Sequence, residues 1–149
     1  MRLEITLPGK PYPQPRIRVS KFGVYHPKEH KEKIKKTSMF LKESAELQKL
    51  KYTEGPIRVT IVTVCRLPKR FARKRKPRVA ASGKRFYKIS KPDIDNYTKY
   101  ILDAATYAGN IWLDDSQVTE LIQKKFTGNQ DEEPYTNVII EPITTEGLL

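Results

Sequence analysis

The chain has 149 residues, which is the length of one domain and enough to bury a hydrophobic core without a disulfide or metal staple. It carries 29 Lys and Arg residues against 17 Asp and Glu, a formal net charge of +12, which indicates a polyanionic partner with nucleic acid as the first candidate. Its apolar runs are far shorter than the about 20 residues of a membrane span, and its first residues lack the apolar core of a secretory signal. Its single cysteine, Cys65, excludes an internal disulfide. We therefore expect a cytoplasmic protein without membrane contact.

The N-terminal residues predict a strand followed by an irregular segment. Residues Arg2 to Leu7 alternate between apolar and polar side chains, which is the pattern of a half-buried strand. Between Lys10 and Arg18, prolines at every second position impose an extended, irregular course. Residues 22–25 suit a short turn or strand.

A helix and a strand follow. Pro27 opens a helical stretch that runs to about Leu50, with Lys residues crowded on one side. The other side is an apolar stripe that consists of Ile34, Ser38, Leu41, Ala45, Leu47 and Gln48. Residues Ile57 to Leu67 form the run richest in β-branched side chains, so they predict a central strand in which Cys65 is a buried small residue.

The positive charge is concentrated in one segment, from Arg66 to Lys91. This segment holds 12 of the 29 basic residues and no acid, so the other 17 basic residues balance all 17 acids. It is too long for a plain connector, and Ser82-Gly83 suits the turn of a protruding hairpin or a mobile arm. One interpretation is a solubilising loop or a nuclear-localisation-like run, and the other is an arm that binds phosphates with salt-dependent affinity. The candidate phosphate contacts within it are Lys69, Arg70, Arg73, Lys74, Arg75, Lys76, Arg78, Lys84, Arg85, Lys88 and Lys91.

The remaining residues place a helix before the last strand. Residues Asp93 to Ala108 repeat apolar side chains at helical spacing, and Gly109 suits the C-terminal cap. Residues Ser116 to Phe126 fit helical and strand spacing alike, whereas Asn137 to Ile143 predict the last strand. We find no internal repeat and no second domain, so the elements predict a single α+β domain over residues 1–149.

Carboxylates follow the basic segment directly. Asp93 and Asp95 stand at the start of the predicted helix, and a second pair, Asp114-Asp115, follows its end. Carboxylates repel phosphate, so a DNA-binding surface that contains them needs a cation. Mg²⁺ suits this position because it takes one or two protein carboxylates and completes its shell with water and phosphate oxygens. Helix capping and ordinary Asp–Lys pairing explain the same residues without a metal, and both interpretations stay open.

The spacing of these side chains permits a shared site at the helix start. Inside a helix, residues two apart point about 200° away from each other. If Asp93 is the N-cap residue, outside the helix, its side chain can fold back toward Asp95 in the first turn. Asp95, Lys99 and Asp103 then lie on one face, where Lys99 neutralises carboxylate charge or reaches a phosphate.

The run from Lys91 to Ala104, then Gly109, then Trp112 to Val118, resembles the signature of the RusA-type Holliday junction resolvases. These are small endodeoxyribonucleases of bacteria and their phages, often prophage-encoded. The resemblance implies a RusA-like fold, with a small mixed β-sheet and two main helices, in which the residues after Ser116 form a strand. It also implies a homodimer that cuts four-way or other branched DNA with Mg²⁺ or Mn²⁺.

The resemblance also implies roles for single residues. By motif, Asp93, Asp95 and Asp115 match the essential metal-binding carboxylates, Asp114 is a possible helper, and Lys99 matches a catalytic lysine. We expect the oxygens of the three essential carboxylates to approach one point, where a metal ion polarises the scissile phosphate and activates a water.

Several other residues carry weaker predictions. Arg16 and Arg18 are candidate phosphate contacts, and Lys125 is a candidate DNA contact. We expect His26 and His30, near a Lys-rich helix start, to be solvated or to cap the helix. Two rival functions stay open: a non-catalytic protein that binds branched DNA or RNA, and a structure-selective nuclease that acts on flaps or forks.

Overall fold

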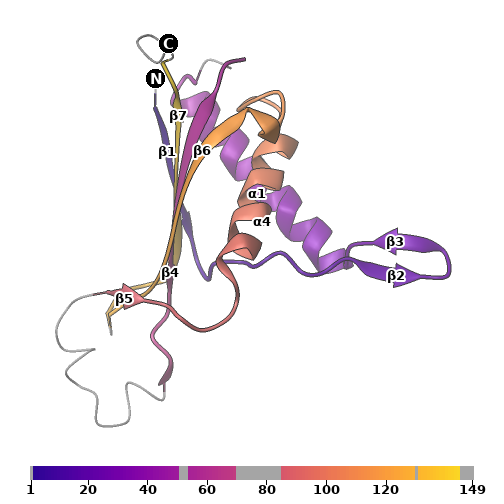
Figure 1. The fold of residues 1–149 in the computed structure, drawn as a ribbon, viewed down its shortest axis with the longest axis vertical. Coiled ribbons are helices and arrows are strands. Elements are labelled where there is room, and N and C mark those ends of the chain that lie inside the picture. Colours follow the sequence, from indigo (N-terminus) through magenta and orange to yellow (C-terminus); the bar gives the residue numbers. More distant parts are fainter. Residues whose placement is uncertain (1, 51–53, 70–84, 130, 145–149) are drawn as a thin grey trace.

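The computed structural model describes residues 2–50, 54–69, 85–129 and 131–144. Two long helices, α1 (Lys28–Leu47) and α4 (Ile94–Ala108), pack on one face of a five-stranded sheet (Figure 1). The strands of this sheet are β1 (Leu3–Pro8), β4 (Ile57–Cys65), β5 (Phe86–Tyr87), β6 (Val118–Thr127) and β7 (Tyr135–Pro142). The predicted α+β fold, with a mixed sheet and two main helices, is confirmed.

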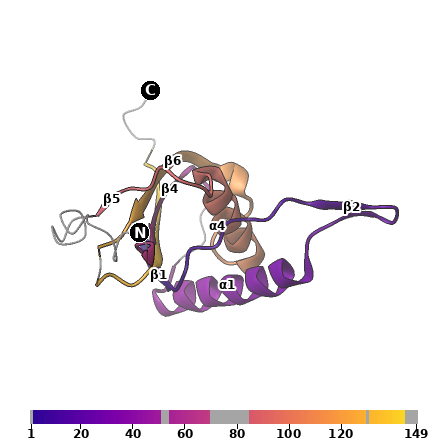
Figure 2. The same cartoon turned by 90° about the horizontal axis from the view of Figure 1, so that it is seen from below.

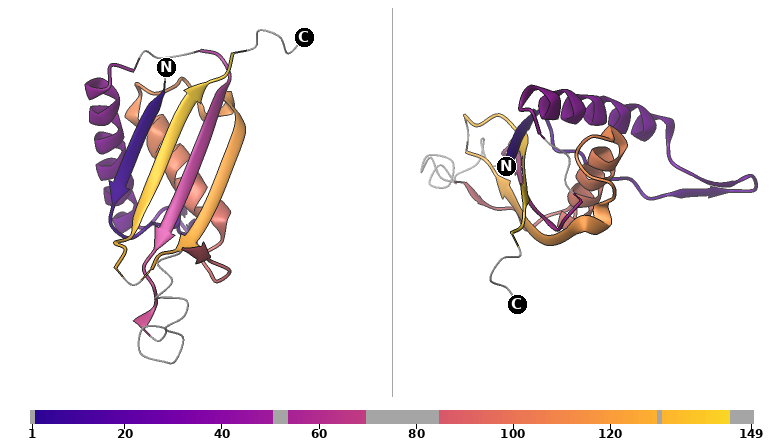
Figure 3. Two further views of the ribbon diagram at one scale, coloured as in Figure 1. Left: turned by 90° about the vertical axis from the view of Figure 1, so that its left-hand side faces the viewer. Right: turned by 90° about the horizontal axis from the view of Figure 1, so that it is seen from above.

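The sheet has the order β1-β7-β4-β6-β5, so β4 is central as predicted. β4 pairs antiparallel with β7 and parallel with β6. A parallel pair needs a long crossover connection, and α4 lies within the connection between β4 and β6. Figure 3 shows β1, β7, β4 and β6 side by side with both helices behind them.

Residues 118–127, whose spacing fits a helix and a strand alike, form the strand β6, so the implication of the resemblance is confirmed. Their pairing with β4 runs from Ile57 beside Val118 to Cys65 beside Thr127. Backbone hydrogen bonds to the central strand β4 outweigh the helical spacing of the apolar side chains in this segment. Cys65 is half-buried rather than fully buried, and its sulfur lies 3.6 Å from the hydroxyl of Tyr97.

The hydrophobic core lies between the sheet and the two helices. Alternate residues of β4 are buried, and they face the apolar stripe of α1, where Ile34, Leu41 and Ala45 are buried as predicted. The prediction that Leu47 belongs to this stripe is wrong, because its side chain is 84% exposed. Leu47 lies two residues after Ala45, which turns it about 200° away from the core.

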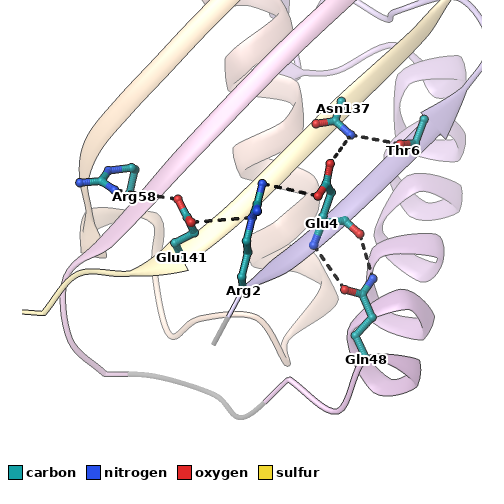
Figure 4. A network of polar contacts seen from close by, with 7 residues as sticks. All are labelled: Arg2, Glu4, Thr6, Gln48, Arg58, Asn137 and Glu141. Carbon is teal, nitrogen blue, oxygen red and sulfur yellow. Dashed lines mark hydrogen bonds and ion pairs between the residues drawn. The ribbon is translucent and has the colours of Figure 1, made fainter.

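The sheet face away from the helices is covered with polar side chains (Figure 4). Arg2 forms ion pairs with Glu4 at 3.5 Å and with Glu141 at 3.7 Å, while Asn137 donates a hydrogen bond to Glu4. Gln48, after the end of α1, donates to the backbone carbonyl of Glu4 at 2.9 Å. Exposed ion pairs contribute little to stability individually, but this polar face is compatible with water on one side of the sheet.

In the parts of the chain that the structure describes, neither helix is both long and apolar enough to cross a membrane. The greater part of the basic segment lies outside the described residues, and so does the turn predicted at Ser82-Gly83. The predicted DNA contacts that fall there are Arg70, Arg73, Lys74, Arg75, Lys76, Arg78 and Lys84.

Candidate active site

The N-terminus of α4 presents two carboxylates to solvent. Asp93 is the N-cap residue and lies outside the helix with an extended backbone (φ −68°, ψ 148°), and Asp95 lies in the first turn. The side chain of Asp93 makes no capping hydrogen bond, and both residues are exposed. Plain capping therefore does not explain Asp93, and the positive end of the helix dipole favours negative charge at this point.

Lys99 and Asp103 follow on the same face of α4 but have different surroundings. Lys99 is exposed one turn after Asp95. Asp103 is half-buried, and its Oδ2 accepts a hydrogen bond at 3.1 Å from Nε2 of the buried Gln14. The backbone N–H of Gln14 also donates to the carbonyl of Asn96 at 3.0 Å. The proline-rich segment is thus fastened to the helix that carries the site, a role for Gln14 that no local pattern in the sequence signals.

Lys125 supports the segment that leads into Asp93. Its Nζ donates to the carbonyl oxygens of Ser90 at 2.9 Å and Pro92 at 2.8 Å. The backbone carbonyl of Lys125 accepts a hydrogen bond from the N–H of Lys88 at 3.0 Å. Two of the three ammonium donors are therefore used inside the chain. Lys125 positions the segment that leads into the site, and its predicted contact with DNA stays a prediction.

The second acidic pair lies beyond the other end of α4. Asp115 begins the short helix η1 (Asp115–Gln117), and Asp114 is its N-cap residue. The Ser116 hydroxyl donates to Oδ2 of Asp114 at 2.5 Å, and this hydrogen bond holds the pKa of the Asp114 carboxyl below its ordinary value. Gln117 accepts the backbone N–H of Leu113 at 2.7 Å, which closes the turn. Asp114 is therefore built into a helix cap.

The two acidic pairs are separated by the length of α4. Its 15 residues span about 22 Å at 1.5 Å each. The strand β6 gives a second measure of this separation. The side chain of Lys125 reaches the Pro92 carbonyl, near one acidic pair, whereas Val118 directly follows η1, near the other. The strand from Val118 to Lys125 is about 23 Å long. Mg²⁺ binds oxygen at about 2.1 Å, so Asp115 does not join Asp93 and Asp95 in one chain.

The arrangement of potential metal ligands agrees with this separation. Among the described residues, no group of three or more His, Cys, Asp or Glu side chains is arranged to hold one metal ion. The expectation that three carboxylates approach one point is therefore not met within a single chain. This separation was predictable from the sequence, because Asp93 lies at one end of the predicted helix and Asp115 lies beyond the other. The exposed pair Asp93 and Asp95 still suits Mg²⁺, which commonly uses only one or two protein carboxylates.

The described basic residues near the site differ in how they are held. Arg85, a predicted DNA contact, pairs with Glu132 at 2.5 Å and donates to the Tyr135 hydroxyl, and this pairing holds the pKa of the Glu132 carboxyl below its ordinary value. Its guanidinium is thus engaged within the chain. Lys88 donates to the Ser90 hydroxyl at 2.7 Å. Lys69 and Lys91 are exposed, as are Arg16 and Arg18.

The histidines have a different role from the one predicted. His30 is only 2% exposed, so it is neither solvated nor a cap. Its ring stacks on Tyr12 at a centroid distance of 5.9 Å and lies 4.7 Å from the ring of His26. Burial lowers the pKa of the His30 imidazole, and the neighbouring His26 acts in the same direction. The pair packs the start of α1 against the proline-rich segment.

The comparison with known families agrees with the motif at the two ends of α4. The family described as "Endodeoxyribonuclease RusA" matches residues 8–141, and the chain belongs to this family, whose general activity is Holliday junction resolution. The chain is also 32% identical, over 90 residues, to the uncharacterized protein YqaN of Bacillus subtilis (strain 168). That match covers 60% of this chain and 60% of the relative.

Proposed function

We propose that this protein is a cytoplasmic, structure-selective DNA endonuclease that resolves four-way junctions by metal-dependent phosphodiester hydrolysis. The observation that carries the proposal is an exposed carboxylate pair at a helix N-terminus, Asp93 and Asp95, within a chain that belongs to an endodeoxyribonuclease family. Exposed carboxylates next to a strongly basic segment are compatible with DNA when a cation neutralises them. A binding protein without catalysis would have no need of this pair.

The residues of the α4 N-terminus have distinct proposed tasks. Asp93 and Asp95 bind the divalent ion, Mg²⁺ or Mn²⁺, which supplies Lewis-acid activation of phosphate and water when bound. Lys99, exposed one turn further along, stabilises negative charge that develops on the phosphate. Lys125 keeps the segment before Asp93 in place through its two carbonyl contacts.

A homodimer accounts for the separation of the acidic pairs. A two-fold axis that sets two α4 helices antiparallel places the Asp93 end of one copy beside the Asp115 end of the other. The same operation creates a second, identical site. Each site then contains Asp93, Asp95 and Lys99 from one copy and Asp115, with its neighbour Asp114, from the partner. Two symmetric sites match the two symmetric cuts that a four-way junction needs.

One cutting assay tests the nuclease proposal. A labelled synthetic four-way junction is incubated with the protein and Mg²⁺, with EDTA, and with the Asp95→Asn variant. We expect cutting only by the parent protein with a divalent ion, while Asp95→Asn retains or improves junction binding because it removes a negative charge near phosphate. Asp131→Asn, at an exposed aspartate outside the site, is the matched control and should cut normally. Flap and duplex substrates separate a resolvase from a broader structure-selective nuclease.

The alternative function is a non-catalytic protein that binds branched DNA or RNA. The separation of the carboxylates within one chain is the observation that favours it. Junction binding with no cutting under Mg²⁺ or Mn²⁺ would support this alternative and refute the nuclease proposal.

A further inference from the structure

A two-stranded hairpin projects from the body of the molecule. It consists of β2 (Arg18–Ser20) and β3 (Gly23–Tyr25), paired antiparallel from Arg18 beside Tyr25 to Ser20 beside Gly23. Figures 1 and 2 show it extending away from the sheet and the helices. All of its residues are exposed, and isolated hairpins of this length are marginally stable in water. A projecting hairpin with no packing partner in the described chain indicates a surface that binds something else.

The exposed side chains of the hairpin combine apolar and positive groups. Val19 is 80% exposed, Val24 is 65% exposed, and Phe22, at the turn, is 89% exposed. Residues 16–25 also contain three cations, Arg16, Arg18 and Lys21, and no acid. Cations that neutralise phosphates together with an aromatic ring that stacks on bases are the usual elements of single-strand and branched nucleic-acid contacts. A hairpin whose charged residues are all basic is complementary to a polyanion.

The base of the hairpin is anchored to the candidate active site. Gln14, two residues before Arg16, is bonded to the Asn96 carbonyl and the Asp103 carboxylate of α4 at 3.0 and 3.1 Å. On the other side, His26 follows the hairpin directly and packs against His30 of α1. Prolines on both sides of Gln14 restrict the backbone further. The hairpin therefore has a defined direction relative to Asp93 and Asp95.

We propose that residues 16–25 form a second DNA-contact element, in which Arg16, Arg18 and Lys21 bind phosphates and Phe22 stacks on an exposed base at the branch. The proposal rests on the proposed function, since it assumes that the substrate is branched DNA. The reach is sufficient: Arg16 to Ser20 spans up to about 13 Å in extended conformation before the turn that carries Phe22, which exceeds the about 8.5 Å depth of a major groove. DNA bound at the N-terminus of α4 is thus within reach of a basic hairpin with Phe22 at its turn.

Two variants test the proposal through binding, which is measured in EDTA so that cutting does not interfere. The first replaces Arg16, Arg18 and Lys21 with Gln, and the second is Phe22→Ala. The probe is a fluorescent four-way junction with 2-aminopurine at the branch point, titrated at several salt concentrations. We expect the triple variant to reduce the slope of log affinity against log salt by about 2 to 3. We expect Phe22→Ala to weaken binding about 5- to 150-fold, with loss of the 2-aminopurine response and an unchanged slope.

The controls separate this proposal from its alternatives. Leu47→Ala, at an equally exposed apolar residue of α1, should bind like the parent protein. The proposal would be overturned if both hairpin variants bound the junction with the affinity and the salt dependence of the parent protein. It would also be overturned if the variants changed from dimer to monomer while the slope of log affinity against log salt stayed the same, because the hairpin would then form a contact between copies. A parent protein that binds junctions through the hairpin but never cuts them would refute the nuclease proposal alone. A parent protein that binds no DNA would refute both.

Discussion

Subunit complementation tests whether each active site is shared between two copies. The two variants are Asp95→Asn and Asp115→Asn. Asp95 lies at the start of α4 and Asp115 lies beyond its end, so the about 22 Å length of the helix separates the two substituted carboxylates in one chain. Each variant alone should be inactive, because every site in its dimer lacks one carboxylate. After the two are mixed and refolded together, half of the dimers contain one copy of each. In a mixed dimer with shared sites, one site carries both substitutions and the other carries none, so about a quarter of the parental sites are restored by symmetry.

The assay is cleavage of a supercoiled plasmid that extrudes a four-way cruciform. Because a mixed dimer has one intact site, it should produce nicked circles, whereas the parent protein produces linear DNA. Titration with Mn²⁺, followed by calorimetry, gives a readout that does not depend on cutting: the mixture should regain about one tight site for every four in the parent protein. A mixture with no cleavage and no regained Mn²⁺ site would refute the shared-site arrangement. Mixing either variant with Asp131→Asn controls for refolding.

Two further predictions concern stability. Gln14→Ala removes the side-chain hydrogen bond that joins the proline-rich segment to Asp103, so we expect the free energy of unfolding in urea to fall by about 1–3 kcal/mol. Leu47→Ala, at an exposed residue away from this contact, is the control, and an unchanged urea midpoint in Gln14→Ala would contradict the reasoning. The lowered pKa of buried His30 means that the unfolded chain binds more protons below its ordinary pKa of about 6.5. Stability should therefore be lost as the pH falls below about 6.5, and the urea midpoint of His30→Gln should depend less on pH; equal slopes for both proteins would count against this role of His30.

Most elements of the fold were predictable because their signals are local. The alternation of Arg2 to Leu7 and the spacing of Asp93 to Ala108 each report which side of one element is apolar, and a left-handed Gly109 (φ 78°) ends the helix as its type suggests. A helix boundary near Asp93 was also predictable, because Pro92 keeps Lys91 away from helical backbone angles. Leu47 shows the limit of such patterns, because a position two residues after the buried Ala45 already points into solvent.

Contacts between distant segments were not predictable in this way. Gln14 meets Asp103 across 89 residues, and Lys125 reaches the carbonyl of Pro92 across 33, without any periodic pattern that links them. The ambiguous residues after Ser116 became a strand only because β4 offers a parallel partner. Arg85 was one basic residue among many in the sequence, and only the fold places Glu132 beside it.

By itself, the sequence determined the family of this protein and placed a basic segment directly before an aspartate pair, from which we predict the metal ligands and a polyanionic partner. These features depend on residue types and on short spacings, so a short stretch of sequence is enough to recognise them. Only the tertiary structure decided where the groups lie relative to one another. A rigid helix of about 22 Å keeps the two aspartate pairs apart, and Gln14 fastens the segment that leads into a basic hairpin to the same helix. This arrangement is the reason why we propose a second copy and branched DNA as the partners of the site.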